Sequence, residues 1–115
     1  MLAAEAKAPS SGAAELFSAL GDSNRLQLIG RLSDGRPHSI SQLSEGMRLT
    51  RQGVTKHLRI LEGAGLVRSS RVGRESRFRL EPEAIDEARS YLETVSRQWD
   101  MALTRLKALV ESGSE

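Results

Sequence analysis

Between residues 82 and 110, apolar side chains recur at alternating intervals of three and four positions. This heptad spacing predicts one helix with a continuous apolar seam over about four heptads. At about 1.5 Å per residue the helix would be roughly 43 Å long, too long for a small domain to cover by itself. We therefore expect it to pack partly on its own domain and partly on a second copy of the chain. The seam consists of Ile85, Ala88, Leu92, Val95, Trp99, Ala102, Leu106 and Leu109.

The stretch 50–64 predicts a shorter helix with two chemically different faces. Thr50 suits the N-cap, because its hydroxyl can accept an amide proton that is left unpaired at a helix start. Val54, Leu58 and Leu61 recur at helical spacing and form an apolar face. A helix whose other face is cationic and bears an amide suits a DNA major groove, although a solvated surface helix is the alternative. That other face consists of Arg51, Gln52, Thr55, Lys56 and Arg59.

Three short helices are expected before this one, at residues 13–20, 22–32 and 39–46. Gly21 separates the first two, and Asp22 is a strong N-cap for the second. The third helix connects through a short, glycine-containing link to the cationic helix. Two helices joined in this way, the second of them cationic, indicate a helix-turn-helix. The side chains expected to face inward from the second helix are Leu26, Ile29 and Leu32.

A basic β-hairpin is expected directly after the cationic helix. Residues 66–72 and 75–80 have strand-like patterns, and Gly73-Arg74 between them is a two-residue hairpin turn signal. A structural role alone does not explain so many arginines in so short a hairpin. A second element that contacts phosphates, a wing beside the cationic helix, is the simpler interpretation. The arginines are Arg68, Arg71, Arg74, Arg77 and Arg79.

The charges of the chain are unevenly distributed. The formal net charge is only +2, yet residues 48–79 hold nine Lys and Arg against two acids. Residues 81–115 hold four Lys and Arg against eight acids. A basic middle between acidic or neutral ends indicates one surface that faces a polyanion.

The composition also excludes several classes of site and segment. The chain has no cysteine, which excludes disulfides and thiolate metal sites. No long apolar run is present, so we expect neither a signal peptide nor a membrane anchor, and a cytoplasmic protein without a membrane partner. Residues 1–12 are expected to be a disordered tail and residues 111–115 to fray. The domain would therefore span residues 13–110.

With this order of elements, the chain resembles the ArsR/SmtB family of bacterial winged-helix transcriptional regulators over nearly all of residues 13–110. The resemblance implies a homodimer that is paired through terminal helices and binds an imperfect palindrome in an operator. It also implies repression that a ligand relieves. The segments that carry it are LFSALGDSNRLQLIGRL, SQLSEGMRLTRQGVTKHLRILEGAGLV and the wing VRSSRVGRESRFRL.

The sequence departs from the family in the sensor. Many members bind metal through a cysteine pair in the first helix of the helix-turn-helix, where this chain has no thiol. Others use His and carboxylates on the last helix, but no histidine follows His57 here. His38 and His57 lie 19 residues apart without partners at ligand spacing. We therefore expect no metal and no cofactor, and the sequence identifies no inducer.

The fold class expected is mainly α (α+β), a winged helix-turn-helix of order α-α-α-α-β-β-α with a long C-terminal dimerisation helix. The function expected is a homodimeric repressor of transcription with double-stranded operator DNA as its partner. A protein-interaction adaptor that binds no DNA is the alternative, and an enzyme is the weakest interpretation, because no residue has the neighbours of a catalytic group. The residues expected at the DNA are Thr50, Arg51, Gln52, Thr55, Lys56, Arg59, Arg71, Arg74 and Arg77, and those expected at the dimer interface are Leu16, Leu92, Val95, Trp99, Ala102 and Leu106.

Overall fold

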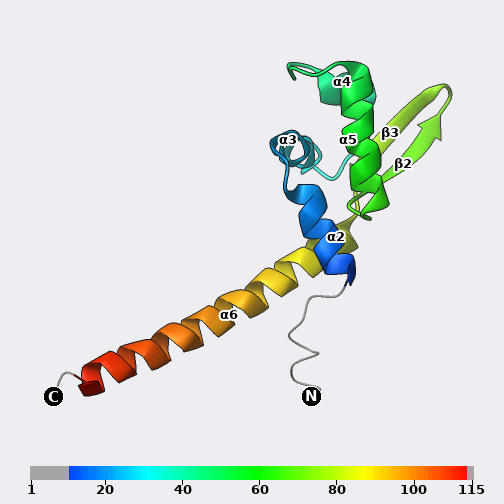
Figure 1. Ribbon diagram of the computed structural model, residues 1–115. Coiled ribbons are helices and arrows are strands. Elements are labelled where there is room, and N and C mark those ends of the chain that lie inside the picture. The colour runs from blue at the N-terminus through cyan, green and yellow to red at the C-terminus, as the bar shows by residue number, and fades with distance from the viewer. Residues whose placement is uncertain (1–10, 114–115) are drawn as a thin grey trace.

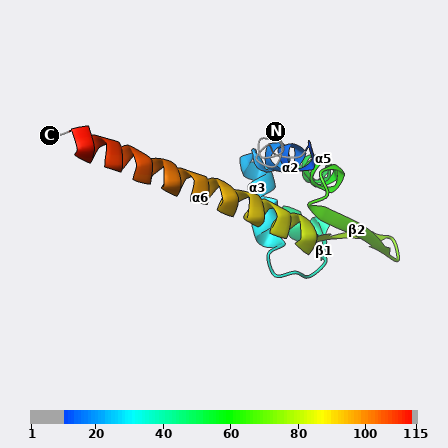
Figure 2. The same ribbon diagram turned by 90° about the horizontal axis from the view of Figure 1, so that it is seen from below.

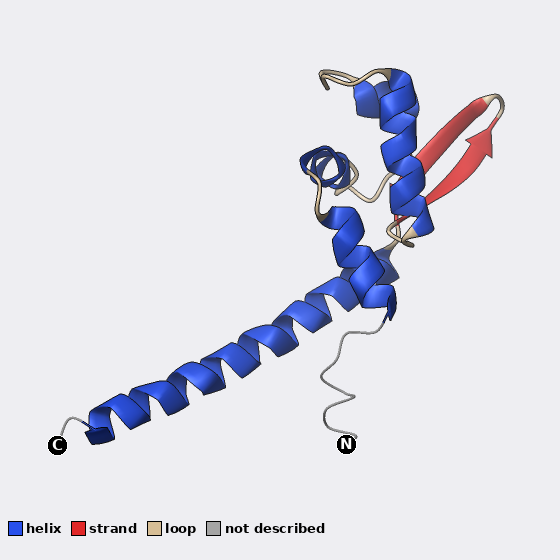
Figure 3. Ribbon diagram, in the orientation of Figure 1, coloured by secondary structure: helices blue, strands red, loops and turns tan. Residues whose placement is uncertain are grey.

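A computed structural model describes residues 11–113 as a small domain from which one long helix projects (Figures 1 and 3). The expected tail at residues 1–12 lies mostly outside the described residues, and the first helix already begins at Ser11. The last helix continues to Gly113, three residues beyond the expected end. The elements are α2 (Ser11–Leu20), α3 (Ser23–Arg31), β1 (His38–Ser39), α4 (Ile40–Ser44), α5 (Arg51–Gly63), β2 (Val67–Val72), β3 (Glu75–Leu80) and α6 (Pro82–Gly113).

Side-chain caps determine where the inner helices begin. Asp22 accepts hydrogen bonds from the amides of Asn24 and Arg25 at 3.0 and 3.1 Å and starts α3. Ser39 and Gln42 form a reciprocal capping box at the start of α4. Because each cap satisfies amides that a helix start leaves unpaired, these positions define the helix-turn-helix of α4 and α5.

The sheet has three strands in the order β1-β3-β2, and both pairs are antiparallel. The wing β2–β3 turns at Gly73, whose φ of +66° lies in the region that glycine adopts most easily. Strand β1 was not expected from the sequence: His38 pairs with Phe78 and Ser39 with Arg77. A strand of two residues is too short to show an alternating pattern, so periodicity could not reveal it. It joins the wing to the start of α4.

The core lies where α2, α3, α4 and α5 meet the base of the wing. Of the three side chains expected to face inward here, Leu32 is fully buried and Ile29 packs against the core, but Leu26 is 53% exposed and Leu28 is buried instead. Leu26 and Leu32 are six residues apart, about 120° away from one another around a helix, so they cannot share a narrow face. The largest fully buried side chains of the described residues are Leu16, Leu28, Leu32, Leu43, Val54, Leu58, Leu61, Leu66 and Phe78.

Helix α6 packs on the domain only near its start. Ala84 is buried there, and the ring of Tyr91 lies 5.5 Å from that of Phe17 in α2. The 32 residues correspond to a helix about 48 Å long, and the molecule measures 71 × 32 × 21 Å (Figure 2). No helix within residues 11–113 is both long enough and apolar enough to cross a membrane. The second half of α6 therefore stands in solvent in the single subunit.

Candidate nucleic-acid interface

Helix α5 presents its cationic face away from the core, as its pattern predicts. Val54, Leu58 and Leu61 are fully buried, which fixes the opposite side of the helix outward. Arg51, Gln52 and Lys56 lie exposed on that side, and their side chains have no polar partner among residues 11–113.

Two threonines at the start of α5 have their hydroxyl groups engaged. The Thr50 hydroxyl accepts a hydrogen bond from the amide of Gly53 at 3.0 Å, as expected of the N-cap. The Thr55 hydroxyl donates to the carbonyl of Arg51 at 2.8 Å and still has lone pairs to accept with. The Thr55 side chain is half-buried on the flank of the exposed face.

Arg59 is exposed, but its guanidinium is already paired within its own domain. Its guanidinium donates to the Glu62 carboxylate at 2.7 Å and lies 5.3 Å from the centre of the Phe78 ring. Ser69 donates to the second Glu62 oxygen at 2.6 Å. These bonds, first from Ser69 and then from Arg59, lower the pKa of the Glu62 carboxyl. The cluster fastens α5 to the wing.

The wing divides its arginines between internal pairs and free side chains. Arg68 pairs with Glu81 at 2.6 Å, and Arg77 pairs with Glu75 at 2.9 Å. Arg71 and Arg74 are exposed, and neither has a partner in the described part of the chain. Of the wing residues expected at DNA, two are thus free and Arg77 is occupied.

A surface hollow of about 360 Å³ joins α4, α5 and the wing tip. Arg51 from the start of α5 and Arg74 from the tip both line it. The hollow brings together three elements that are separated in the sequence, and it contains two free guanidinium groups. Hydroxyl groups that the sequence did not single out also line it, from Ser41 and Ser76.

One further exposed cation lies near these residues. Arg48 stands in the link between α4 and α5, two residues before the N-cap, and has no partner among residues 11–113. Sequence reasoning counted its charge without assigning it a role. Its position just before the cationic helix could have indicated a role at the same surface.

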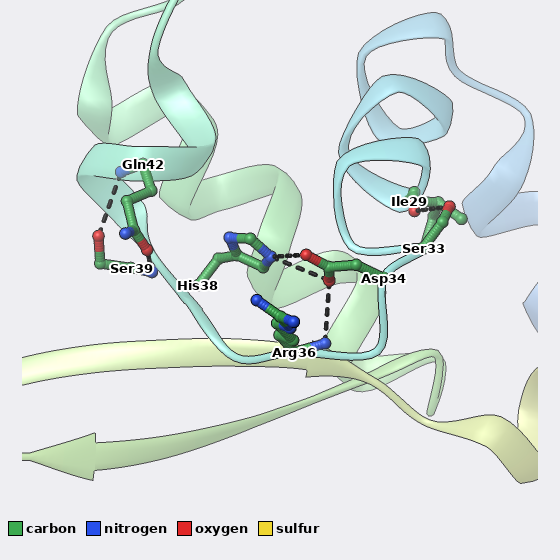
Figure 4. A network of polar contacts seen from close by, with 7 residues as sticks. All are labelled: Ile29, Ser33, Asp34, Arg36, His38, Ser39 and Gln42. Carbon is green, nitrogen blue, oxygen red and sulfur yellow. Dashed lines mark hydrogen bonds and ion pairs between the residues drawn. The ribbon is translucent and has the colours of Figure 1, made fainter.

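Both histidines are engaged within the domain. His38 Nε2 lies 2.9 Å from Asp34 Oδ2, and Asp34 also accepts the Arg36 amide at 2.9 Å (Figure 4). The Arg36 amide, and then His38, lower the pKa of the Asp34 carboxyl. His57 contacts Arg25 and Asp22. Within residues 11–113, no three His, Asp or Glu side chains are grouped as a metal site would require.

The residues expected at a dimer interface fall into two groups. Leu92 and Trp99 are 55% and 63% exposed, Leu106 is similarly exposed, and Val95 and Ala102 are half-buried along the same helix. Leu16 differs, because only 2% of it is exposed and it lies in the core of its own subunit. A side chain with no free surface offers nothing to a partner, so Leu16 is left out of the interface considered below.

Comparison with known proteins agrees with this arrangement. Residues 20–70 match a family described as a helix-turn-helix domain. The chain is 30% identical over 96 residues to the HTH-type transcriptional regulator Rv2034 of Mycobacterium tuberculosis, covering 84% of this chain and 86% of that one. It also superimposes on an ArsR-like transcriptional regulator from Rhodococcus sp. RHA1 with a TM-score of 0.72, at 32% identity, covering 86% and 92% of the two chains. The chain belongs to the ArsR family of winged helix-turn-helix regulators.

This ArsR-family chain is therefore a DNA-binding transcriptional regulator and not an enzyme. Its fold also matches the homodimeric winged helix-turn-helix domain of Mb0332 from Mycobacterium bovis, with a TM-score of 0.59, 24% identity and 82% and 83% of the two chains covered. That likeness supports the fold alone. Helix α5 is the second helix of the helix-turn-helix, the position called the recognition helix in this motif.

Proposed function

We propose that this regulator is a homodimeric repressor that binds a palindromic operator. In this proposal α5 enters the major groove and the wing β2–β3 follows the adjacent minor groove. Two subunits would each read one half-site, about one helical turn or roughly 34 Å apart. A protein of this kind would act in the cytoplasm, where the bacterial chromosome lies.

The hollow shared by α5 and the wing carries this proposal. Arg51 and Arg74 line it from two elements, and the acid in its lining, Glu75, is already paired with Arg77 at 2.9 Å. Free guanidinium groups that converge on one surface suit a phosphate chain passing across that surface. A protein-interaction adaptor does not require free guanidinium groups on one surface. This arrangement therefore favours DNA binding over the adaptor hypothesis.

The free side chains of α5 are the best candidates to read bases. Gln52 can pair with adenine through two hydrogen bonds, and Arg51 or Lys56 can do so with guanine. Thr55 lies beside them and can accept a further bond. Thr50, Arg71 and Arg74 would contact the sugar-phosphate backbone. Arg59 and Arg77 join them only by exchanging Glu62 and Glu75 for phosphate.

The exposed seam of α6 is the element that would hold two subunits together. We define the α6 seam as the residues Leu92, Val95, Trp99, Ala102, Leu106 and Leu109, most of them exposed in the single subunit. One helix in one groove makes few contacts, so two linked copies are needed for tight specific binding.

The proposal is tested by measuring binding to the DNA upstream of the protein's own gene and to a shuffled sequence of equal length. The wild type should prefer the first by at least about 1000-fold at physiological salt. Equal binding to the two DNAs would contradict the assignment as a repressor of its own gene.

Gln52→Ala tests base reading within the same experiment. We expect a loss of about 1–3 kcal/mol per base pair contacted for the operator, with relaxed preference at matching positions of both half-sites. The control is Arg97→Ala, which removes an exposed cation from α6 and should leave both affinities unchanged. If Gln52→Ala weakened shuffled DNA as much as the operator, Gln52 would be a backbone contact.

A further inference from the structure

A polar cluster joins the recognition helix to two other helices. It lies where α2 ends and α3 begins, and it consists of Asp22, Arg25 and His57. The His57 side chain is only 18% exposed, although its neighbour Lys56 on α5 is free. His57 therefore points into the domain from the same turn of α5 whose exposed residues are proposed to contact DNA.

Arg25 is the centre of this cluster. Its Nε donates to the carbonyl of Ala19, one of the last four of α2, and its Nη1 lies 3.2 Å from Nδ1 of His57. An arginine side chain can only donate hydrogen bonds, so Nδ1 must be the acceptor in this contact. In the tautomer that makes this bond, Nδ1 carries no proton and Nε2 carries it.

Asp22 lies beside the Arg25–His57 contact but makes no hydrogen bond to the ring. Its Oδ2 lies 3.8 Å from Nδ1 of His57, beyond hydrogen-bonding distance, and accepts the backbone amides of Asn24 and Arg25 instead. The bond from the Arg25 amide is the main reason that the pKa of the Asp22 carboxyl is lowered. The carboxylate thus offsets the guanidinium charge near the ring, and the three residues form one directional contact between α3 and α5.

Apart from this cluster, α5 is held by apolar packing and, near its C-terminal end, by the hydrogen bond from Ser69 of the wing to Glu62. Val54, Leu58 and Leu61 hold the helix through packing, which has no strong directional preference. A directed hydrogen bond on the flank of the helix restricts its rotation about its own axis. Such a rotation would shift Gln52 and Lys56 relative to the bases.

We propose that Arg25 is a positioning residue for the recognition helix and acts through a hydrogen bond to Nδ1 of His57. This inference rests on the proposed role of α5 in reading DNA. It assigns to Arg25, which lies outside α5 and the wing, a part in sequence discrimination. Loss of the contact should leave phosphate binding intact while the operator loses its advantage over other sequences.

Two histidine variants separate positioning from direct contact with DNA. In His57→Asn the side-chain oxygen stands near the Nδ1 position and can still accept from Arg25, whereas in His57→Gln the amide stands near the Nε2 position. We expect His57→Asn to keep operator affinity within about threefold of the wild type. We expect His57→Gln to lose at least tenfold for the operator and less than threefold for shuffled DNA. The opposite ranking would show that Nε2 itself touches DNA and would overturn the proposal.

Arg25→Met removes every donor and keeps most of the side-chain length. We expect it to lower the ratio of operator to shuffled-DNA affinity at least tenfold, and the double variant Arg25→Met/His57→Gln to lose no more than the larger single loss. Additive losses would mean that the two residues act independently, against the proposal. The matched control is Arg89→Met, because Arg89 pairs with acids of its own helix α6, far from the cluster.

Nitrogen NMR of the histidine rings tests the same contact without DNA. At neutral pH His57 in the wild type should show a protonated Nε2 and an unprotonated Nδ1. Arg25→Met should shift the Nδ1 resonance of His57 and leave His38 unchanged. Protonation at Nδ1 in the wild type would overturn the inference even if the protein binds its operator. If the wild type showed no operator preference but the expected ring state, the proposed function would fail instead.

Discussion

At the scale of single residues, the interface depends on which cations are neutralised within the subunit. Arg71 and Arg59 are both exposed arginines in the basic part of the chain, yet only Arg59 has an acid at 2.7 Å and an aromatic ring beneath it. A guanidinium that is already paired must give up that partner before it gains a phosphate. The free arginines should therefore dominate the electrostatic part of binding.

The salt dependence of DNA binding distinguishes these two arginines. Arg71→Ala should weaken operator and shuffled DNA alike, and it should flatten the plot of log affinity against log salt by about 1 per subunit. Arg59→Ala should change that slope less and lower thermal stability more, because it breaks the contact with Glu62 and Phe78. Titrations at several salt concentrations check both, and equal slopes for the two variants would contradict this ranking.

The cluster around Glu62 should also make stability depend on pH. Because the folded-state pKa of Glu62 is lowered, its contribution to stability is complete above the unfolded value, about 4.3, and is lost as pH falls through the folded value. Glu62→Gln should therefore be less stable than the wild type at pH 7, and the difference should shrink below about pH 4. Urea unfolding at fixed protein concentration measures this, with Glu87→Gln on exposed α6 as the control.

At the scale of elements, the sequence best predicted the helices and turns that begin at a capping residue or a turn glycine. Asp22 and Thr50 cap helices at the expected positions, and Gly73 turns the wing where expected. Contacts between distant residues could not be predicted. Arg25 meets His57 across 32 positions and Arg59 meets Phe78 across 19, and neither pairing leaves a periodic trace. The exposed, cationic side of α5 was thus readable, whereas the internal engagement of Arg59 was not.

A helix and the sheet meet at the start of α4. Ser39 caps the helix through its hydroxyl, and its backbone pairs with Arg77 in β3. Ser39→Ala should lower the free energy of unfolding by about 1 kcal/mol, because a helix cap and half of a capping box are lost. Urea unfolding checks this against Ser41→Ala, an exposed residue of the same helix. An equal loss of unfolding free energy in both variants would show that the Ser39 cap does not stabilise the helix.

At the scale of the whole molecule, the single subunit leaves much apolar surface uncovered. Most of the α6 seam is exposed among the described residues, and Trp99 is 63% exposed. The sequence predicted this correctly, because a helix about 48 Å long exceeds the domain that carries it.

The seam makes dimerisation testable separately from folding. Leu92→Asp places a carboxylate where a partner helix would bury it, and an unpaired buried carboxylate costs several kcal/mol. Because Leu92 is 55% exposed in the single subunit, that subunit should stay folded while the dimer dissociates. Operator binding should then be lost and the emission of Trp99 should shift to the red. Sedimentation of this variant decides the matter, together with Ser90→Asp, which adds the same charge on the opposite face of α6 and should remain a dimer. A Leu92→Asp protein that sediments as a dimer and binds DNA normally would remove α6 from the interface.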